Sequence, residues 1–328
     1  MIVTRTPFRV TLGGGGTDLP SYYEKYGGFI FSAGINKYVY VDVNRPTSDD
    51  LIRIKYSESE TVSDIKDVRH QVAREVLRYA GVDKNIEVSS VADIPAGTGL
   101  GSSSCYAVGL LHALHTLKHE YTPLEQMAEE DFRIEEGILK RPIGKQDPYL
   151  AAFGGLTVLD IATDGTVKVR KANVSLEIAD ELNQNLLMFF TGDTRNADDI
   201  LSEQSTAAKE EKKEVIESMH HIKELGYGIL DAVESGNLDD VGRKFHEHWQ
   251  YKKKISTKMT KPEYDVIYNA ALKGGALGGK ISGAGGGGFL TFYVPEKHRE
   301  FREAMKEFGL REMRYRFDFD GSKVLADF

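Results

Sequence analysis

Three short glycine clusters are the feature that most constrains what this chain can fold into. They are Gly13–Gly16, Gly97–Gly101 and Gly283–Gly288. Each adjoins a segment with the periodicity of a strand or helix, whereas a flexible linker would be longer, richer in serine and free of such flanks. Glycine permits positive φ angles and close approach of the backbone to a ligand. The clusters therefore predict three tight loops on an ordered scaffold.

The second cluster has the pattern of an anion site. Residues 95–104 read Pro-Ala-Gly-Thr-Gly-Leu-Gly-Ser-Ser-Ser, and apolar spacing predicts a helix over 102–119. Glycines allow backbone N–H groups to converge, and the start of a helix adds its positive dipole end. The three hydroxyls can bond phosphate oxygens or ligate Mg²⁺. On local grounds alone, a glycine turn with serine N-caps remains the alternative.

Commoner nucleotide and hydrolase motifs do not fit. Residues 274–280 read G-x-x-x-x-G-K, but Ile281 stands where a Walker A loop has Ser or Thr. The first cluster fails the dinucleotide pattern G-x-G-x-x-G at its last glycine. No serine lies in the G-x-S-x-G of an α/β-hydrolase.

Composition excludes several classes of protein. The formal net charge of −8 argues against a nucleic-acid partner, which needs a basic face. No apolar run approaches the ~20 residues of a membrane span, and the start, MIVTRTPFRV, lacks the layout of a signal peptide. Cys105 is the single cysteine and fits a reducing compartment. We therefore expect a cytoplasmic protein with no membrane or nucleic-acid partner.

The 328 residues suggest two domains of an α+β fold. The pattern changes after about residue 180, so we place the domains at 1–175 and 176–328. The periodicity further predicts the following elements: a strand at 37–44 with residues 50–56 as its hairpin partner, long helices at 196–229 and 238–254, and a last strand at 313–320.

Charged residues near these loops are candidates for chemistry. Asp147 is predicted in a loop between a helix and a strand, where catalytic carboxylates tend to occur, although Asp before Pro is also a simple turn former. Glu135 lies in an acidic helix, and its alternative is a solvated face. Arg9 follows Pro7 and could clamp a phosphate or pair on the surface.

Two further groups of basic residues are most simply interpreted as solvated side chains. His112, His115 and His119 have spacings that would suit a metal, but they lie off the apolar stripe and are predicted to be solvated. The run Lys252–Lys254 is predicted to be a solvated helix end. Its alternative role is to supply cations to a phosphorylated substrate.

Taken in order, the three clusters resemble the motifs of the GHMP small-molecule kinase superfamily. Thr6–Val10 followed by Gly14–Asp18 resembles the first motif in its sugar-kinase form. Residues 95–104 match the second motif, P-x-x-x-G-L-G-S-S, at every defining position, and Lys280–Phe289 match the third. The resemblance covers nearly the whole chain.

Within this superfamily the chain is most similar to the D-glycero-D-manno-heptose 7-phosphate kinases. The likeness rests on Gly14–Asp18 and on residues 146–155 and 194–200. Those kinases usually read Ala-Gln-Asp-Gln-Tyr where this chain has Lys145-Gln-Asp-Pro148-Tyr. The same group includes sugar-1-kinases such as fucokinases, whose first motif is similar.

The resemblance implies a two-domain fold, with an N-terminal half like domain 2 of ribosomal protein S5 and a ferredoxin-like C-terminal half. It also implies ATP and Mg²⁺ as cofactors and these roles: Asp147 and Arg9 in catalysis; Gly97, Gly99, Leu100, Gly101, Ser102, Ser103 and Ser104 around the ATP phosphates; Ser103 and Glu135 at the metal; and Gly15, Gly16, Thr17, Asp18, Arg195, Gly283, Gly285 and Gly286 around the substrate.

The implied reaction transfers the γ-phosphate of ATP to the anomeric O1 of the heptose 7-phosphate, a step that would feed nucleotide-activated heptose to surface polysaccharide. Another sugar-1-kinase, of the fucose or galactose type, is the alternative within the enzyme class. A ligand sensor without turnover is the alternative outside it. A homodimer is possible.

Overall fold

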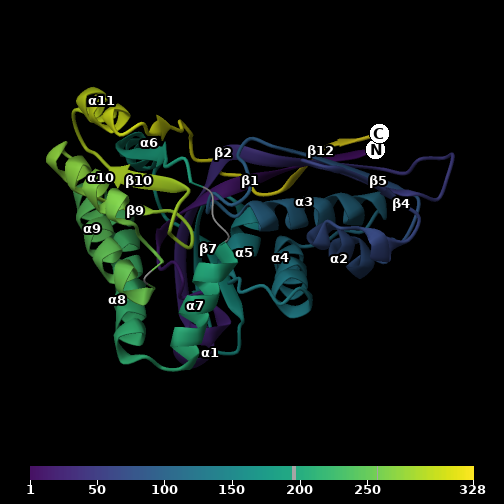
Figure 1. Cartoon of the computed structure of the whole chain (residues 1–328), viewed down its shortest axis with the longest axis horizontal. Coiled ribbons are helices and arrows are strands. Elements are labelled where there is room, and N and C mark those ends of the chain that lie inside the picture. Colours follow the sequence, from purple (N-terminus) through teal and green to yellow (C-terminus); the bar gives the residue numbers. More distant parts are fainter. Residues whose placement is uncertain (194–196, 257) are drawn as a thin grey trace.

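The structure is a computed structural model that describes residues 1–193, 197–256 and 258–328, without the side chain of Ala197. Two sheets form its framework (Figure 1). The helices are α1 Pro20–Tyr26, α2 Gln71–Tyr79, α3 Ser102–Leu117, α4 Leu124–Phe132, α5 Gln146–Phe153, α6 Leu176–Asn185, α7 Ala197–Lys209, α8 Lys213–Glu234, α9 Leu238–Ile255, α10 Pro262–Lys273 and α11 His298–Glu307, with a 3₁₀ turn at Ile65–Asp67 and a π-helical turn at Arg133–Ile138. None of the helices in these ranges is long and apolar enough to cross a membrane.

The larger sheet has eight strands within the described residues, in the order β12-β1-β2-β5-β3-β4, with β6 on β2 and β7 on β6. The strands are β1 Ile2–Gly13, β2 Gly28–Asn44, β3 Ile52–Lys55, β4 Ser59–Val62, β5 Ile86–Ala92, β6 Leu156–Ile161, β7 Val167–Lys171 and β12 Lys323–Asp327. Long β2 pairs with β6 along its first half and with β5 along its second. The last strand, β12, returns to pair antiparallel with β1, so the two chain ends lie side by side (Figure 1).

The larger sheet supports the loops of interest on one face. Helix α3 packs on β1 and β2, and α2 and α4 flank it on the same side (Figure 1). The buried positions of α3 include Leu110, Leu111 and Leu114, which join the main core. Burial of this apolar face fixes the N-terminus of α3, and with it the second glycine cluster.

The smaller sheet is antiparallel, in the order β11-β8-β10-β9 over the described residues. Its strands are β8 Leu186–Phe190, β9 Gly278–Ile281, β10 Phe289–Tyr293 and β11 Arg311–Glu312. Helix α9 packs on β9 and β10, and aromatic residues such as Trp249, Phe292 and Phe301 fill the core beside them. Helix α8 lies between α9 and the larger sheet, since it contacts α9 as well as β1 and β2.

The α+β class is confirmed, while the domain limits at 1–175 and 176–328 stay a prediction. Residues 50–56 contain β3, but β3 is not a hairpin partner of β2: it pairs with β4 and, in parallel, with β5, which occupies the edge of β2. The single helix predicted over 196–229 was wrong, because the chain turns at Glu211, where φ is +53°, and forms α7 and α8. The strand predicted over 313–320 is also wrong, because within that range only Phe317 forms a bridge, to Ile35.

The contact between α8 and the larger sheet depends on facing glycines. A Cβ at Gly226 would lie 2.8 Å from Phe29 Cδ1 and 2.9 Å from the backbone N of Gly14. A Cβ at Gly13 would lie 2.7 Å from the Cα of Gly226. Only a chain without side chains at both positions allows this close approach of helix and strand.

We expect Gly226→Ala to lower the free energy of unfolding by about 1–3 kcal/mol, because the methyl group overpacks this contact. The higher helix propensity of alanine alone would raise the free energy of unfolding by about 1 kcal/mol. Gly228→Ala is the matched control on the same helix, since its added methyl would meet only the flexible side chain of Lys244. Denaturant unfolding of both variants measures the difference, and equal stabilisation of the two would contradict the close contact.

Candidate active site

A cleft of about 970 Å³ opens between the two sheets. Its lining includes Gly15 and Gly16 of the first cluster, Gly97, Gly99 and Gly101 of the second, and Gly283 of the third. The charged candidates Arg9, Asp18, Glu135 and Asp147 line the same cleft. The three glycine loops, far apart in sequence, thus converge on one site.

The second cluster forms a tight loop that leads into α3. Gly97, Gly99 and Gly101 all have positive φ, between +77° and +84°, a region that other residues avoid. Gly101 is the N-cap of α3, and Ser102 begins the helix. The third cluster packs directly on this loop, because a Cβ at Gly283 would lie 2.5 Å from the Gly99 carbonyl oxygen. The arrangement places the N-terminus of α3 at the cleft, as an anion site requires.

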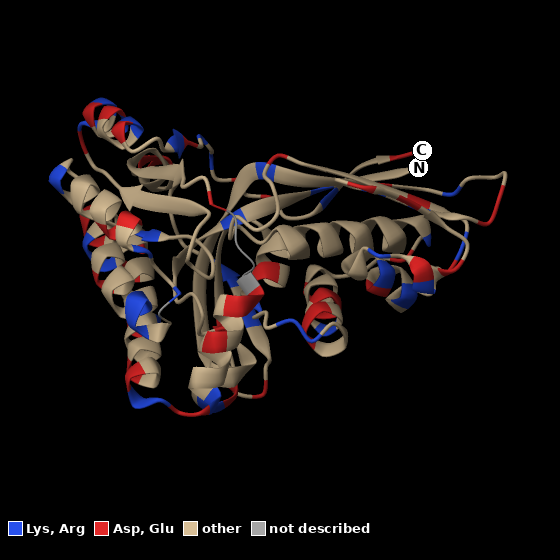
Figure 2. Cartoon of the chain, viewed as in Figure 1, with Lys and Arg blue, Asp and Glu red and all other residues tan. Residues whose placement is uncertain are grey.

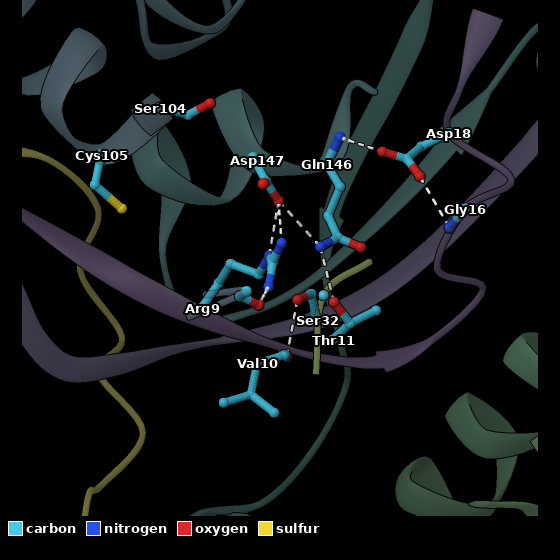
Figure 3. A network of polar contacts seen from close by, with 12 residues as sticks. Arg9, Val10, Thr11, Gly16, Asp18, Ser32, Ser104, Cys105, Gln146 and Asp147 are labelled. Carbon is cyan, nitrogen blue, oxygen red and sulfur yellow. Dashed lines mark hydrogen bonds and ion pairs between the residues drawn. The ribbon is translucent and has the colours of Figure 1, made fainter. Parts of the chain in front are cut away.

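An ion pair joins Arg9 and Asp147 (Figure 3), and both residues line the cleft. Arg9 Nε and Nη2 lie 2.7 and 2.6 Å from Asp147 Oδ1, and Nη1 donates to the Gly99 carbonyl at 2.8 Å. The backbone N–H of Arg9 also donates to the Leu100 carbonyl at 3.2 Å. Arg9, which is 5% exposed, therefore joins strand β1, the glycine loop and helix α5.

Asp147 keeps one oxygen available. Oδ1 accepts from Arg9 and from Gln146 Nε2, at 3.2 Å, whereas Oδ2 has no hydrogen-bond donor among the described residues. Oδ2 lies 3.5 Å from where a Cβ would stand on Gly101, so it faces the glycine loop. Asp147 is in the first turn of α5, not in the loop predicted for it, because helix α5 already begins at Gln146. Pro148 fits there, since a first-turn N–H has no partner within the helix.

Asp18 is held beside this pair through Gln146 (Figure 3). The carboxylate of Asp18 accepts from the backbone N–H of Gln146 at 2.9 Å and of Gly16 at 3.1 Å. The side chain of Gln146 donates to Thr11 Oγ1 at 2.8 Å. Burial raises the pKa of Asp18, and the Gln146 N–H opposes that shift. The result is a row of fixed oxygen acceptors along β1 and α5, suited to binding hydroxyl groups.

A second acidic centre lies at the start of α3. Ser103 Oγ donates to Glu135 Oε2 at 2.5 Å, and Ser104 Oγ donates to Oε1 at 3.1 Å. Arg141 Nη1 donates to the same Oε2 at 2.8 Å. Glu135 is fully buried, on the π-helical turn Arg133–Ile138, a distortion that is frequent at functional sites. Burial and the neighbouring Glu135 raise the pKa of the buried Asp131 well above its usual range.

The donor set of this centre fits Mg²⁺. Hydroxyl and carboxylate oxygens are the ligands this ion prefers, and it commonly takes one or two carboxylates together with substrate phosphates. Ser103 and Glu135 are the residues that would hold it. The described residues contain no cluster of three or more His, Cys, Asp or Glu side chains able to hold a metal alone.

The opposite wall, from the C-terminal half, is cationic. Lys252 Nζ donates to the carbonyls of Ile281 at 3.3 Å and Gly283 at 2.5 Å, and Lys280 Nζ donates to that of Leu12 at 2.6 Å. The prediction of a solvated helix end is therefore wrong for Lys252, because residues 281–283 cover it. Burial lowers the pKa of Lys252 to about 7. Figure 2 marks Lys and Arg positions in blue along the helices of this half, interspersed with Asp and Glu positions in red.

The predicted site residues are placed as follows. Ser102, Ser103 and Ser104 line the cleft with the residues named above, whereas Leu100 contributes its carbonyl to the Arg9 backbone. Thr17 is buried and donates to the carbonyls of Gly14 and Phe29, so it shapes the loop. Gly285 and Gly286 pack on Met259 behind the cleft. Arg195 lies outside the described residues.

Sequence reasoning missed Arg141, Gln146, His248 and Lys280 as lining residues. Gln146 belongs to residues 146–155, on which the resemblance rests, but no local sequence pattern predicts its hydrogen bonds to Thr11 and Asp18. The histidines of α3 were predicted to be solvated, and this was wrong for two of them. His112 contacts Ser322 Oγ at 3.0 Å, and His115 lies between Glu120 and Glu130, at 3.0 and 2.7 Å.

Comparisons with known proteins agree on one family. The description "GHMP kinases N terminal domain" matches residues 67–155, and "GHMP kinases C terminal" matches residues 229–310. A D-glycero-alpha-D-manno-heptose 7-phosphate kinase of Campylobacter jejuni is 29% identical over 98% of this chain and 97% of its own. An L-fucokinase/L-fucose-1-P guanylyltransferase of Bacteroides fragilis is 25% identical over 91% of this chain and 35% of its own.

The solved structures support the same fold. A D-glycero-D-manno-heptose 1-phosphate kinase of Bacteroides thetaiotaomicron superposes with a TM-score of 0.83 at 27% identity, covering all of both chains. The two-domain architecture predicted from the motifs is thereby confirmed.

The lowered pKa of Lys252 has a measurable consequence for stability. Between pH 7.5 and 9.5 the unfolded chain holds about one more proton at this residue, so its contribution to stability rises by about 1.4 kcal/mol per pH unit. We expect Lys252→Met to flatten the pH dependence of the unfolding free energy by that amount. Denaturant unfolding across this range measures it, and parallel curves for the two proteins would contradict the shift.

Proposed function

Because the chain belongs to the GHMP kinase family, and is therefore a small-molecule kinase that takes its phosphate from ATP, we propose that it phosphorylates D-glycero-D-manno-heptose 7-phosphate. The acceptor is the anomeric O1, and the product is the 1,7-bisphosphate. Such a product would feed nucleotide-activated heptose to surface polysaccharide. The names of the two heptose relatives place the phosphate at different positions, so the position belongs to the proposal.

The single observation that carries the proposal is the free oxygen of Asp147. Oδ1 is held by Arg9, while Oδ2 faces the glycine loop and has no donor among the described residues. A sugar hydroxyl placed between Oδ2 and the loop would be in line for the γ-phosphate. Asp147 would accept its proton as the new O–P bond forms and the bond between the γ-phosphorus and the β–γ bridging oxygen breaks, which releases ADP.

The rest of the cleft supplies positions for both substrates. The loop 97–104 and the start of α3 would hold the ATP phosphates, and Ser103 with Glu135 would hold Mg²⁺, which neutralises phosphate charge. Beyond the loop, the lining residues Val39, Tyr56, Val91 and Ile94 would receive the adenine.

The residues at the other end would bind the sugar. Asp18 and the backbone of Gly15 and Gly16 face its hydroxyl groups. Arg195, outside the described residues, stays a candidate for a phosphate contact.

The two departures from the heptose-kinase pattern lie away from the cleft. Lys145 is buried and binds Glu129 at 2.6 and 2.7 Å, with its ammonium 4.0 Å from the ring centroid of Phe132. Pro148 occupies the first turn of α5. Neither side chain lines the cleft, so these substitutions leave the proposed substrate site as it is.

The alternative within the enzyme class is a kinase for an unphosphorylated sugar such as fucose. The similarity to the fucokinase of Bacteroides fragilis supports this second candidate. A ligand sensor without turnover is disfavoured, because Arg9, Ser103, Glu135 and Asp147 all converge on the cleft. The cytoplasmic location and a possible homodimer stay predictions.

The substrate can be tested by ADP release with Mg-ATP. We expect strong turnover with D-glycero-D-manno-heptose 7-phosphate and weak turnover with the free heptose, fucose or galactose. A preference for a free hexose would support the alternative, a kinase for an unphosphorylated sugar. Absence of turnover with all four sugars would reject both candidates.

We expect Asp147→Asn to lower kcat by about 10²- to 10⁴-fold with ATP affinity nearly unchanged. The asparagine carbonyl can still accept from Arg9, so the geometry is kept while the basic oxygen is lost. Steady-state kinetics and ATP titration measure the two effects. Asp160→Asn, on β6 away from the cleft, is the matched control and should retain normal kcat. Near-normal kcat for the Asp147 variant would rule out its role as base.

A further inference from the structure

Three buried basic side chains on the C-terminal wall of the cleft have no acidic partner among the described residues. His248 and Lys252 lie one turn apart on α9, and Lys280 lies on the adjacent strand β9. Their exposed fractions are 1%, 7% and 3%. All three line the cleft. We refer to them as the basic wall.

The hydrogen bonds of the basic wall include no acidic acceptor among the described residues. Both ammonium groups donate only to backbone carbonyls, of Ile281 and Gly283 for Lys252 and of Leu12 for Lys280. Neither ring nitrogen of His248 has a hydrogen-bond partner. In the part of the chain that the structure describes, no carboxylate lies within 4.0 Å of Lys252 or Lys280.

Other buried cations of the molecule are neutralised. Arg9 is paired with Asp147, and Lys145 is paired with Glu129. A buried lysine without a counter-ion tends to lose its proton, because an unpaired buried charge is costly. An anion that enters beside it restores the charged form, so two such lysines lining one cleft are arranged to receive an anion. A neutral imidazole beside them adds a hydrogen-bond donor without adding charge.

The position of the basic wall favours the sugar end of the cleft. Lys280 binds the carbonyl of Leu12, which directly precedes the first glycine cluster, Gly13–Gly16. That cluster and Asp18 form the proposed sugar site. The ATP phosphates already have their own donors, in the loop 97–104 and the start of α3.

We propose that the basic wall, Lys252 and Lys280 with His248, binds the phosphate group that the sugar already carries before the reaction. The inference rests on the proposed function, because it names the part of the site that recognises a phosphorylated sugar. A phosphate dianion bridging the two ammonium groups would accept charge-assisted hydrogen bonds from both, and a third from the imidazole. Specificity for a phosphorylated sugar over a free one then follows from two cations that only the phosphate neutralises.

The titration behaviour of the wall is consistent with this role. Burial and the nearby charges of Lys252 and Arg9 lower the pKa of Lys280, and burial followed by Lys280 and Lys252 lowers that of His248. An anion bound between these groups would raise their pKa values again in part, since an opposite charge favours the protonated form.

The test compares Lys252→Met and Lys280→Met with Lys254→Met, whose side chain is exposed on the same helix. For each variant, kcat/KM is measured with heptose 7-phosphate and with free heptose, and KM is measured for ATP. We expect both wall variants to lose about 30-fold or more in kcat/KM for the phosphorylated sugar. Free heptose, the KM of ATP and the Lys254 control should change less than about threefold.

The inference is overturned if a wall variant loses kcat/KM equally with both sugars, or if its KM for ATP rises instead. Either result would assign these residues to the transferred phosphate. Calorimetric titration of wild type and Lys252→Met with heptose 7-phosphate, without ATP, gives a second readout. Thermal unfolding checks that each variant is folded. Removal of an unpaired buried basic group should favour the folded state.

The two proposals fail in different ways. If wild type prefers heptose 7-phosphate but the wall variants keep that preference, only the present inference fails. If wild type prefers a free hexose and binds no heptose 7-phosphate, the proposed function fails and the inference fails with it.

Discussion

The ion pair between Arg9 and Asp147 is the interaction on which the rest of the site depends. A single guanidinium group holds a carboxylate of α5 and a carbonyl of the glycine loop, and it does so from the middle of β1. Breaking a buried pair leaves the partner charge uncompensated, so the three segments are held to one geometry. The pair also directs the free carboxylate oxygen, because Arg9 takes Oδ1 and leaves Oδ2 facing the loop.

The cleft joins two walls of opposite character. The wall from the larger sheet carries acidic residues that accept protons or hydroxyl groups, with Glu135 and Asp18 at its two ends. The wall from α9 and β9 carries basic side chains that have no acid beside them in the part of the chain that the structure describes. A ligand that is a polyol at one end and an anion at the other matches this division of charge.

The sequence predicted the parts of the site that local chemistry determines. The glycine loops and the start of α3 were predicted from local pattern, because positive φ angles and helix starts require particular residues. Arg9 and Asp147 were candidates from their position near these loops, whereas the role of Asp18 came from the resemblance alone. The helix that contains Asp147 was missed, since Pro148 was interpreted as a turn signal when it lies in a first turn. Strand pairing was wrong for 50–56, where the pattern indicates a strand but carries no information on its partner.

The basic wall could not have been predicted in full. A run of three lysines at a helix end is normally solvated, and only the fold shows that residues 281–283 cover Lys252 and not Lys254. His248 and Lys280 are distant in sequence from the motifs of the larger sheet. Their common position results from packing of α9 against β9, which no local spacing reveals.

The pairing of β12 with β1 has a consequence for biosynthesis. Strand β1 is synthesised before every other described strand, yet its outer neighbour β12 is made only after almost the whole described chain. Until then the edge of β1 keeps unpaired N–H and C=O groups that other strands could join. The larger sheet therefore closes last at β1, and a nascent chain is exposed to wrong pairing at that edge until β12 has been made.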